Sequence, residues 1–396
     1  MKWEKVKLGD VCEITSSKRI FYSEYVDDGV PFYRSKEIIE SDEGKIIENP
    51  LYISVDKYNE IKEKFGVPQT GDMLLTSVGT IGIPYIIKKK DCFYFKDGNL
   101  TWFRDFREGL NSKYLYYWIK SSEGTGTLYN TTIGSSQKAL TISALKNIKV
   151  SLPPRSVQDK IVEVVSVYND LIENNQKQIK LLEEVAQRLY KEWFVDLNFP
   201  GHENTKIVDG VPEGWNEKTL SQVADVIMGQ SPKSEFYNSE KKGLPFHQGV
   251  GSYGVRFVMD DIYSTSYTRI AEPNSILFSV RAPVGRLNIT KNKVVIGRGL
   301  AAINQADGCQ SYLYYLLKNR FFKDNIVGNG SIFASVSKDE LLNQKFLIPE
   351  RNLMMQFEKI VSQMDKQIEN LDSKNKKLIE ARDRLLPKLM SGEVEV

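Results

Sequence analysis

The same order of sequence landmarks occurs twice in this chain of 396 residues. Gly-x-Pro-Phe occurs at 29–32 and again at 243–246, and Leu-Tyr-Tyr occurs at 115–117 and again at 313–315. A longer run at 72–82 matches another at 275–285. Because a repeat of this kind comes from duplication of one structural unit, the sequence predicts two similar domains in tandem. Such a chain has pseudo-twofold symmetry, which suits a target made of two parts or two copies of one partner.

Each repeated segment alternates short β-rich runs with turn residues. The β-rich runs lie at 71–87, 92–106 and 275–290, and one helix is expected in each segment, near Ser112–Lys120 and near Ser311–Phe322. Neither segment shows the regular βαβ alternation of a doubly wound domain. The pattern therefore predicts an α+β (mixed α/β) fold for both domains.

Two long helical stretches follow the repeated segments. Residues 158–194 contain no Pro or Gly, and apolar residues recur there in alternating steps of four and three, a pattern repeated 196 residues later. Heptads sustained over this length indicate a coiled coil, and helices related by a twofold axis pair antiparallel. The expected helix-pair interface comprises Ile161, Val165, Ile172, Asn175, Ile179, Leu182, Leu189, Trp193, Phe357, Val361, Ile368, Leu371, Asn375, Leu378, Leu385 and Leu389.

A polar residue interrupts each apolar seam, Asn175 in the first helix and Asn375 in the second. An antiparallel pairing centred on the seam sets Ile161 near Leu389 and places the two asparagines in one layer. Each amide can then satisfy the other, so the pair fixes the register of the helices. In the alternative interpretation, each asparagine faces solvent at a frayed seam.

The repeat and the helices divide the chain into four expected parts. These are a first domain at 1–152, a spacer helix at 153–197, a second domain at 198–348 and a second spacer helix at 349–396. A helix over 161–193 is about 48 Å long at ~1.5 Å per residue. We expect the two helices to separate the domains as a spacer, by a length that corresponds to about 14 base pairs of B-DNA.

Composition and charge restrict the class of protein. The chain has 54 basic and 51 acidic residues, a net charge of +3, so it is not a strongly basic polycation. Its three cysteines form no C-x-x-C motif, and the sequence shows neither a signal peptide nor an apolar run near 18 residues. We therefore expect a cytoplasmic chain with reduced thiols and no membrane partner.

The motifs of common nucleotide-dependent enzymes are missing from the sequence. There is no P-loop, no Asp/Asn-Pro-Pro-Tyr/Phe motif for methylation of a flipped base, and no glycine-rich loop that opens a βαβ unit for S-adenosylmethionine. The two histidines, His202 and His247, lie near no cluster of Cys or carboxylate residues, so no metal site is expected. The sequence predicts no catalytic activity for the chain alone.

Polar residues in loops are the remaining functional candidates. Lys, Arg, Gln and Ser side chains can contact phosphates and base edges, although each one alone is more typical of a solvated surface. At corresponding positions of the two repeats these polar residues differ, whereas the apolar residues around them recur. The candidate DNA contacts are Lys18, Arg19, Arg34, Lys36 and Ser77 in the first repeat, and Ser231, Lys233, His247, Gln248, Arg281, Arg286 and Arg298 in the second.

Several motifs occur in the order found in one known family. They are the domain openings around Trp3 and Trp215, the run Gly229-Gln-Ser-Pro-Lys233, the Leu-Pro-Pro run at 152–154 followed by Gln158, and Leu-Tyr-Lys-Glu-Trp-Phe at 189–194. With these motifs the chain resembles the specificity subunit of type I restriction–modification enzymes over essentially its whole length.

The resemblance implies two target recognition domains, each reading one half of an interrupted site in double-stranded DNA, and antiparallel helices that set the gap. It also implies two methyltransferase subunits docked about the helices for adenine-N6 methylation, with two motor-nuclease subunits as a further possible addition. S-adenosylmethionine, ATP and Mg²⁺ would belong to those partners and not to this chain. Two alternatives remain open from the residues alone: a repeated-domain scaffold that binds protein or glycan, and a self-sufficient nuclease or methylase.

Overall fold

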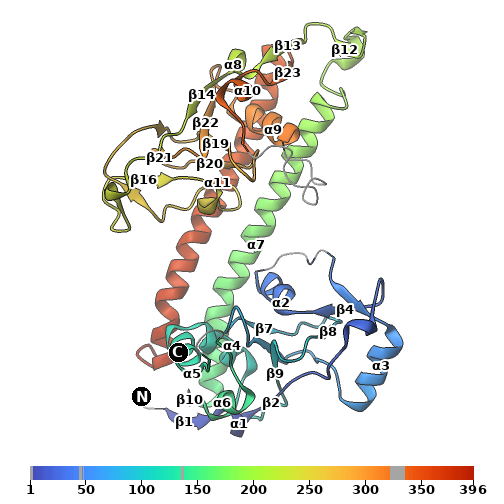
Figure 1. The fold of residues 1–396 in the computed structure, drawn as a ribbon, viewed down its shortest axis with the longest axis vertical. Coiled ribbons are helices and arrows are strands. Elements are labelled where there is room, and N and C mark those ends of the chain that lie inside the picture. The colour runs from blue at the N-terminus through green and yellow to red at the C-terminus, as the bar shows by residue number, and fades with distance from the viewer. Residues whose placement is uncertain (1–2, 44–46, 48, 135–137, 322–334) are drawn as a thin grey trace. The chain divides into compact units, whose positions relative to one another are not determined.

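The computed structural model describes residues 3–43, 47, 49–134, 138–321 and 335–396. The chain forms two compact units (Figure 1). Unit 1 comprises Met1–Lys177 with Asp372–Val396, and unit 2 comprises Gln178–Leu371. Each unit thus contains one repeat together with one end of both long helices, whereas the division expected from the sequence kept each helix whole.

The globular part of unit 1 mixes short helices with two four-stranded sheets, of strand order β2-β9-β6-β7 and β3-β5-β4-β8. The predicted helix near 112–120 is present as α4. The elements are β1 Glu4–Lys7, α1 Leu8–Val11, β2 Glu13–Thr15, η1 Tyr22–Glu24, β3 Tyr25–Val26, β4 Val30–Tyr33, α2 Ser35–Asp42, β5 Leu51–Ile53, α3 Val55–Lys64, β6 Met73–Thr76, β7 Pro84–Ile86, β8 Tyr94–Phe95, β9 Leu100–Arg104, α4 Ser112–Lys120, α5 Ser122–Thr131, α6 Ile142–Asn147 and β10 Lys149–Leu152.

Unit 2 repeats this arrangement with sheets of strand order β14-β22-β19-β20 and β15-β17-β16-β21-β18. Its predicted helix is present as α9, and the predicted last residue, Phe322, lies outside the described residues. The elements are η2 His202–Asn204, β11 Ile207–Val208, β12 Val211–Pro212, β13 Asn216–Thr219, α8 Leu220–Val223, β14 Ala224–Met228, η3 Ser234–Phe236, β15 Tyr237–Asn238, β16 Leu244–His247, η4 Val250–Ser252, β17 Tyr263–Ser264, β18 Ile270–Ala271, β19 Ile276–Ser279, β20 Leu287–Ile289, β21 Val294–Ile296, β22 Leu300–Gln305, α9 Gln310–Phe321, α10 Lys338–Leu342 and β23 Lys345–Ile348.

The two units share the order and pairing of their common strands, although unit 1 has the helices α2 and α3 where unit 2 has η4 and the additional strand β18. Strand β4 pairs with β8 in parallel through Phe32 and Tyr94, and β16 pairs with β21 in parallel through Phe246 and Val295. All other strand pairs of both units are antiparallel within the part of the chain that the structure describes. The repeat seen in the sequence is therefore a repeat of one α+β topology, as predicted.

Polar side chains define where helices of unit 1 begin. The Asn111 side chain accepts a hydrogen bond from the Lys113 N–H and caps α4, which satisfies a backbone donor left free in the first turn. The Asn111 N–H in turn donates to Oε1 of Gln158, a fully buried residue of the first long helix. The Gln158 amide nitrogen donates to the carbonyls of Gly109 and Pro153. Gln158 thus ties the start of α4 to the long helix.

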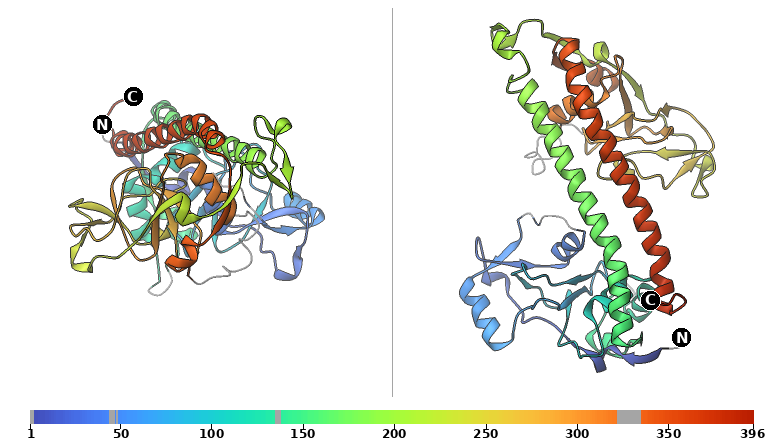
Figure 2. Two further views of the ribbon diagram at one scale, coloured as in Figure 1. Left: turned by 90° about the horizontal axis from the view of Figure 1, so that it is seen from above. Right: turned by 180° about the vertical axis from the view of Figure 1, so that it is seen from behind.

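The long helices are α7 Arg155–Phe194 and α11 Arg351–Ser391. In unit 1 the start of α7 lies beside the end of α11, and Ile161 and Leu389 share one buried cluster (Figure 2). In unit 2 the end of α7 packs on the start of α11, with the rings of Trp193 and Phe357 6.0 Å apart. Both units therefore show the predicted antiparallel course. Neither helix, nor any other helix of the described residues, is long and apolar enough to cross a membrane.

The predicted asparagine layer is present in unit 1. Nδ2 of Asn175 donates a hydrogen bond of 2.8 Å to Oδ1 of Asn375, so the frayed-seam alternative is wrong. Of the other expected interface residues, Ile161, Val165, Ile172, Ile179, Trp193, Phe357, Val361, Ile368, Leu371 and Leu389 are buried, and Leu182, Leu189, Leu378 and Leu385 are half-buried.

Candidate nucleic-acid interface

Three loops of unit 2 meet beside the parallel strand pair β16–β21. They follow β14, β16 and β21 along the chain. The Gly297 N–H donates to the His247 carbonyl at 2.8 Å, and the Gly299 N–H donates to the Gln248 carbonyl at 3.1 Å. The Gln230 N–H donates to the Ile296 carbonyl at 3.0 Å. Backbone hydrogen bonds thus hold the three loops at one place.

Glycines make this close approach possible. A Cβ at Gly299 would lie 2.4 Å from the Gln248 carbonyl oxygen, and one at Gly229 would lie 2.1 Å from the Gly297 carbonyl oxygen. Both distances are far shorter than a van der Waals contact. A side chain at either position would therefore push the loops apart.

The three loops line a polar cavity of about 780 Å³ that is open to solvent. It contains four of the residues predicted to contact DNA, Ser231, Lys233, Gln248 and Arg298. The Arg298 N–H donates to Oγ of Ser231 at 3.2 Å, which links the first loop to the third. Gln230, Pro232, Ser234, Glu235 and Tyr237 complete the wall. Residues 67 positions apart in sequence thus present amide, hydroxyl and guanidinium groups to one space.

The same three loops meet in unit 1, beside β4 and β8. The Lys96 N–H donates to the Tyr33 carbonyl at 2.9 Å, as Gly297 does to His247 in unit 2. The Lys18 N–H donates to the Tyr94 hydroxyl at 2.7 Å and holds the first loop against β8. The exposed Arg19 contacts Asp97 through Nε, at 2.8 Å from Oδ2.

Arg34, another predicted contact residue of unit 1, is held by a buried carboxylate. Nη2 of Arg34 lies 2.6 Å from Oε1 of Glu37, and the Arg34 N–H donates to Oε2 at 2.8 Å. Burial raises the pKa of Glu37, but these hydrogen bonds outweigh it and leave the pKa below its ordinary value. The exposed Lys36 lies near Glu40, at 3.6 Å. Arg34 is therefore the better positioned of the two cations.

The strand register relates three positions of unit 1 to three of unit 2. Arg34 and Gln248 each follow the last residue of the parallel strand, and Asp97 and Arg298 each lie two residues beyond its partner strand. Arg19 and Ser231 each precede the short helix η1 or η3 by three residues. Asp97 was missed as a candidate, because only the strand register relates it to Arg298.

Two predicted contact residues are buried, and the prediction is corrected for both. Ser77 is 2% exposed, and its hydroxyl lies 2.7 Å from that of Thr101. His247 is fully buried between the Ser252 hydroxyl and the Asp260 carboxylate, at 2.8 and 3.1 Å from its two ring nitrogens. Both side chains are buried because they lie on β16 or directly after β6, central strands whose consecutive residues are buried.

The last two candidates lie elsewhere in unit 2. Arg281 is exposed and its backbone bridges to Ser335. Arg286 contributes to a separate cavity of about 420 Å³, together with Tyr314 and Lys318. The structure does not bring these two arginines to the cavity that contains Gln248.

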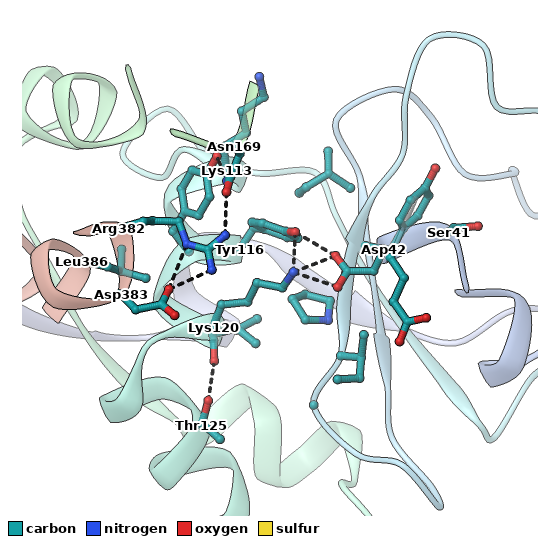
Figure 3. Close-up of a pocket in the computed structure, with 18 of the residues that line it drawn as sticks. Ser41, Asp42, Lys113, Tyr116, Lys120, Thr125, Asn169, Arg382, Asp383 and Leu386 are labelled. Carbon is teal, nitrogen blue, oxygen red and sulfur yellow. Dashed lines mark hydrogen bonds and ion pairs between the residues drawn. The ribbon is translucent and has the colours of Figure 1, made fainter. Parts of the chain in front are cut away.

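A larger cavity, of about 1570 Å³, lies in unit 1 between β7, α4 and its portions of the long helices (Figure 3). Nζ of Lys120 lies 2.7 Å from Asp42, whose carboxylate also accepts a hydrogen bond from the Tyr116 hydroxyl. Arg382 donates to Asn169 at 2.8 Å and contacts Asp383. Hydrogen bonds and ion pairs within the domain, and between the two helices, thus satisfy these groups.

The described residues offer little support for a metal site or for a reactive thiol. No group of three or more His, Cys, Asp and Glu side chains among them could hold a metal ion. Burial raises the pKa of Cys12 to about 12 and that of Cys309 to about 11. Both residues are therefore protonated thiols at neutral pH and poor nucleophiles.

Comparison with known proteins identifies the family. The family model described as type I restriction modification DNA specificity domain matches residues 1–184 and 212–381. The chain is 28% identical over 403 residues to the putative type I restriction enzyme MjaX specificity subunit of Methanocaldococcus jannaschii, covering 100% of this chain and 94% of the relative. It is also 28% identical over 421 residues to the MjaIX specificity subunit of the same organism, with the same two coverages.

A solved structure has the same fold. The S subunit of a type I restriction–modification system from M. genitalium matches with a TM-score of 0.59 at 18% identity, over 98% of this chain and 96% of that one. Since the family model covers most of the chain, once in each repeat, this protein belongs to the family of type I restriction–modification DNA specificity domains.

Proposed function

We propose that each unit reads one half of an interrupted site in double-stranded DNA through its three-loop site. One observation carries this proposal. Both units have the same parallel strand pair with one matching hydrogen bond between the loops that follow it. The three corresponding loop positions hold Arg19, Arg34 and Asp97 in unit 1 and Ser231, Gln248 and Arg298 in unit 2. Two domains that recognise different DNA sequences need a common backbone with different polar side chains at the contact positions.

The chemistry of these side chains suits base edges. Arginine donates two hydrogen bonds to guanine, glutamine pairs with adenine, and serine contacts either base. Lys18, Lys36 and Lys233 are exposed beside the same loops and suit phosphate contacts, which position a protein without reading sequence. Because phosphate contacts release counterions, binding of DNA by the assembled complex should weaken steeply with salt.

The chain acts with partners that carry the chemistry. The missing catalytic motifs and the family membership support a non-catalytic specificity subunit. Two methyltransferase subunits would dock about the helices and methylate adenine N6 with S-adenosylmethionine. Two motor-nuclease subunits that use ATP and Mg²⁺ would convert the complex to a restriction enzyme.

Co-expression with a methyltransferase subunit of the same system tests the proposal. Methylated adenines on a plasmid are mapped by direct sequencing, with and without this chain. We expect one interrupted motif to be methylated only when the chain is present. A stable complex that methylates no motif would contradict the proposal and favour the scaffold alternative.

A further inference from the structure

The loop site of unit 1 contains an ion pair for which unit 2 has a different arrangement. Arg19 contacts Asp97 at 2.8 Å, whereas the corresponding Ser231 and Arg298 are joined by a backbone-to-hydroxyl hydrogen bond. We propose that Asp97 and Arg19 together read one C·G base pair of the first half-site. Asp97 contacts the cytosine, and Arg19 contacts the guanine. This inference rests on the proposed DNA-reading role of the loop site and names residues that determine its specificity.

The two side chains differ in how firmly they are placed. The side chain of Asp97 is 16% exposed and that of Arg19 is 67% exposed. Asp97 follows directly on β8, and the backbone of the neighbouring Lys96 is bonded to Tyr33 of β4. The carboxylate is therefore held at the end of the sheet, whereas the more exposed Arg19 has room to turn towards a ligand.

Electrostatics explains why the carboxylate comes with an arginine. A carboxylate on a surface that faces DNA is repelled by the phosphates unless a cation accompanies it or it accepts a hydrogen bond from a base. Arg19 supplies the cation in the free protein. Because an ion pair with one highly exposed partner contributes little stability, Arg19 can exchange it for a base contact at small cost.

The chemistry of the pair selects one base pair. In the major groove the cytosine N4 amino group is a donor, which a carboxylate accepts. Adenine also offers an amino donor, but its N7 acceptor lies beside it and repels a carboxylate. The guanine of the same pair presents O6 and N7, the acceptors that arginine recognises. An Asp with an adjacent Arg thus matches C·G better than any other pair.

The test uses the co-expressed complex of full-length chain and methyltransferase subunit. Binding is measured to duplexes that carry the mapped motif and to duplexes with one base pair of the first half-site changed. Asp97→Asn keeps the size of the side chain but adds an amino donor. We expect it to reduce discrimination at one C·G position by roughly tenfold. Reading of the second half-site should not change.

Asp27→Asn is the matched control, because Asp27 is an exposed carboxylate of the same unit outside the three loops. It should leave discrimination unchanged at every position. The double variant Arg19→Ser with Asp97→Arg installs the residues of unit 2 in unit 1. It should abolish the preference for C·G at that position and keep the rest of the first half-site.

Each other outcome overturns the inference. Unchanged discrimination in Asp97→Asn would mean that Asp97 reads no base, and a change at an A·T position or in the second half-site would mean that the assignment is wrong. Loss of binding to every duplex would show that Asp97 supports the domain and does not read DNA. If the unaltered complex recognises no motif at all, the proposed function itself fails, which is a separate result.

Discussion

Single residues decide how well a recognition side chain is positioned before DNA arrives. Arg34 is restrained by Glu37, which is 2% exposed and accepts hydrogen bonds from both the backbone and the guanidinium of Arg34. A side chain already ordered in the free protein loses less entropy on binding. Gln248 has the corresponding position in unit 2 and is exposed.

Glu37→Gln tests this restraint. Removing the charge should lower the free energy of unfolding by about 2 kcal/mol at neutral pH, as measured by urea denaturation. The pKa of Glu37 is depressed in the folded state, so its contribution is present above the ordinary value of 4.5 and is lost as the pH falls through the depressed pKa. The difference between wild type and variant should therefore shrink at acidic pH. Glu40→Gln, at the more exposed pair with Lys36, should change stability by less than about 0.5 kcal/mol.

Gln248→Ala tests the assignment of the second half-site. We expect the variant complex to lose or alter methylation at one position of that half-site, by about 1–3 kcal/mol of discrimination, with the first half-site read as before. Sequencing of methylated adenines gives both results in one experiment. Loss of both half-sites together would instead indicate a destabilised domain.

At the scale of elements, one arginine fastens the domain of unit 2 to the portions of α7 and α11 in that unit. Arg256 is 2% exposed, and its guanidinium contacts Glu183 of α7 at 3.2 Å and Asp365 of α11. It also lies 4.3 Å from the ring centroid of Tyr314.

Arg256→Ala should therefore be strongly destabilising. It leaves two largely buried carboxylates without their cation, which we expect to lower the free energy of unfolding by about 3 kcal/mol. Lys345→Ala is the control, since Lys345 pairs with Glu217 at the surface, and it should leave the free energy of unfolding almost unchanged. Equal effects of the two variants in urea denaturation would show that the buried pairs do not anchor the domain.

The asparagine layer acts on the helix pair as a register device. Asn375→Leu alone should cost about 1 kcal/mol because it leaves the Asn175 amide without its partner. Changing both residues to leucine should restore or raise stability, since two apolar side chains then pack in the seam. A double-mutant cycle measures this coupling, and simply additive effects would argue against a direct bond between the two amides.

For the whole molecule, the proposed spacer role of the helices has a direct test. Inserting one heptad into both α7 and α11 adds about 10 Å of helix. The non-specific gap of the methylated motif should then lengthen by about 3 base pairs, with both half-sites unchanged. An insertion in one helix alone breaks the pairing register and should abolish methylation. An unchanged gap in the double insertion would rule out the spacer role.

Features that repeat along the chain could be predicted from the sequence alone. The duplication, the α+β class, the helices α4, α7 and α11, and the pairing of Asn175 with Asn375 all followed from periodicity. Heptad spacing determines which face of a helix is apolar, and the symmetry of a repeat then determines the antiparallel register. These are local or linear properties, which a sequence records directly.

The tertiary structure decided which polar residues are available to a ligand. It buries His247 and Ser77, places Arg281 and Arg286 apart from the cavity that contains Gln248, and brings Asp97 to Arg19 across 78 positions of the chain. A polar side chain in a loop looks the same in sequence whether it faces solvent or the core. Only the pairing of distant strands determines which loops meet, and therefore which of their side chains can act together.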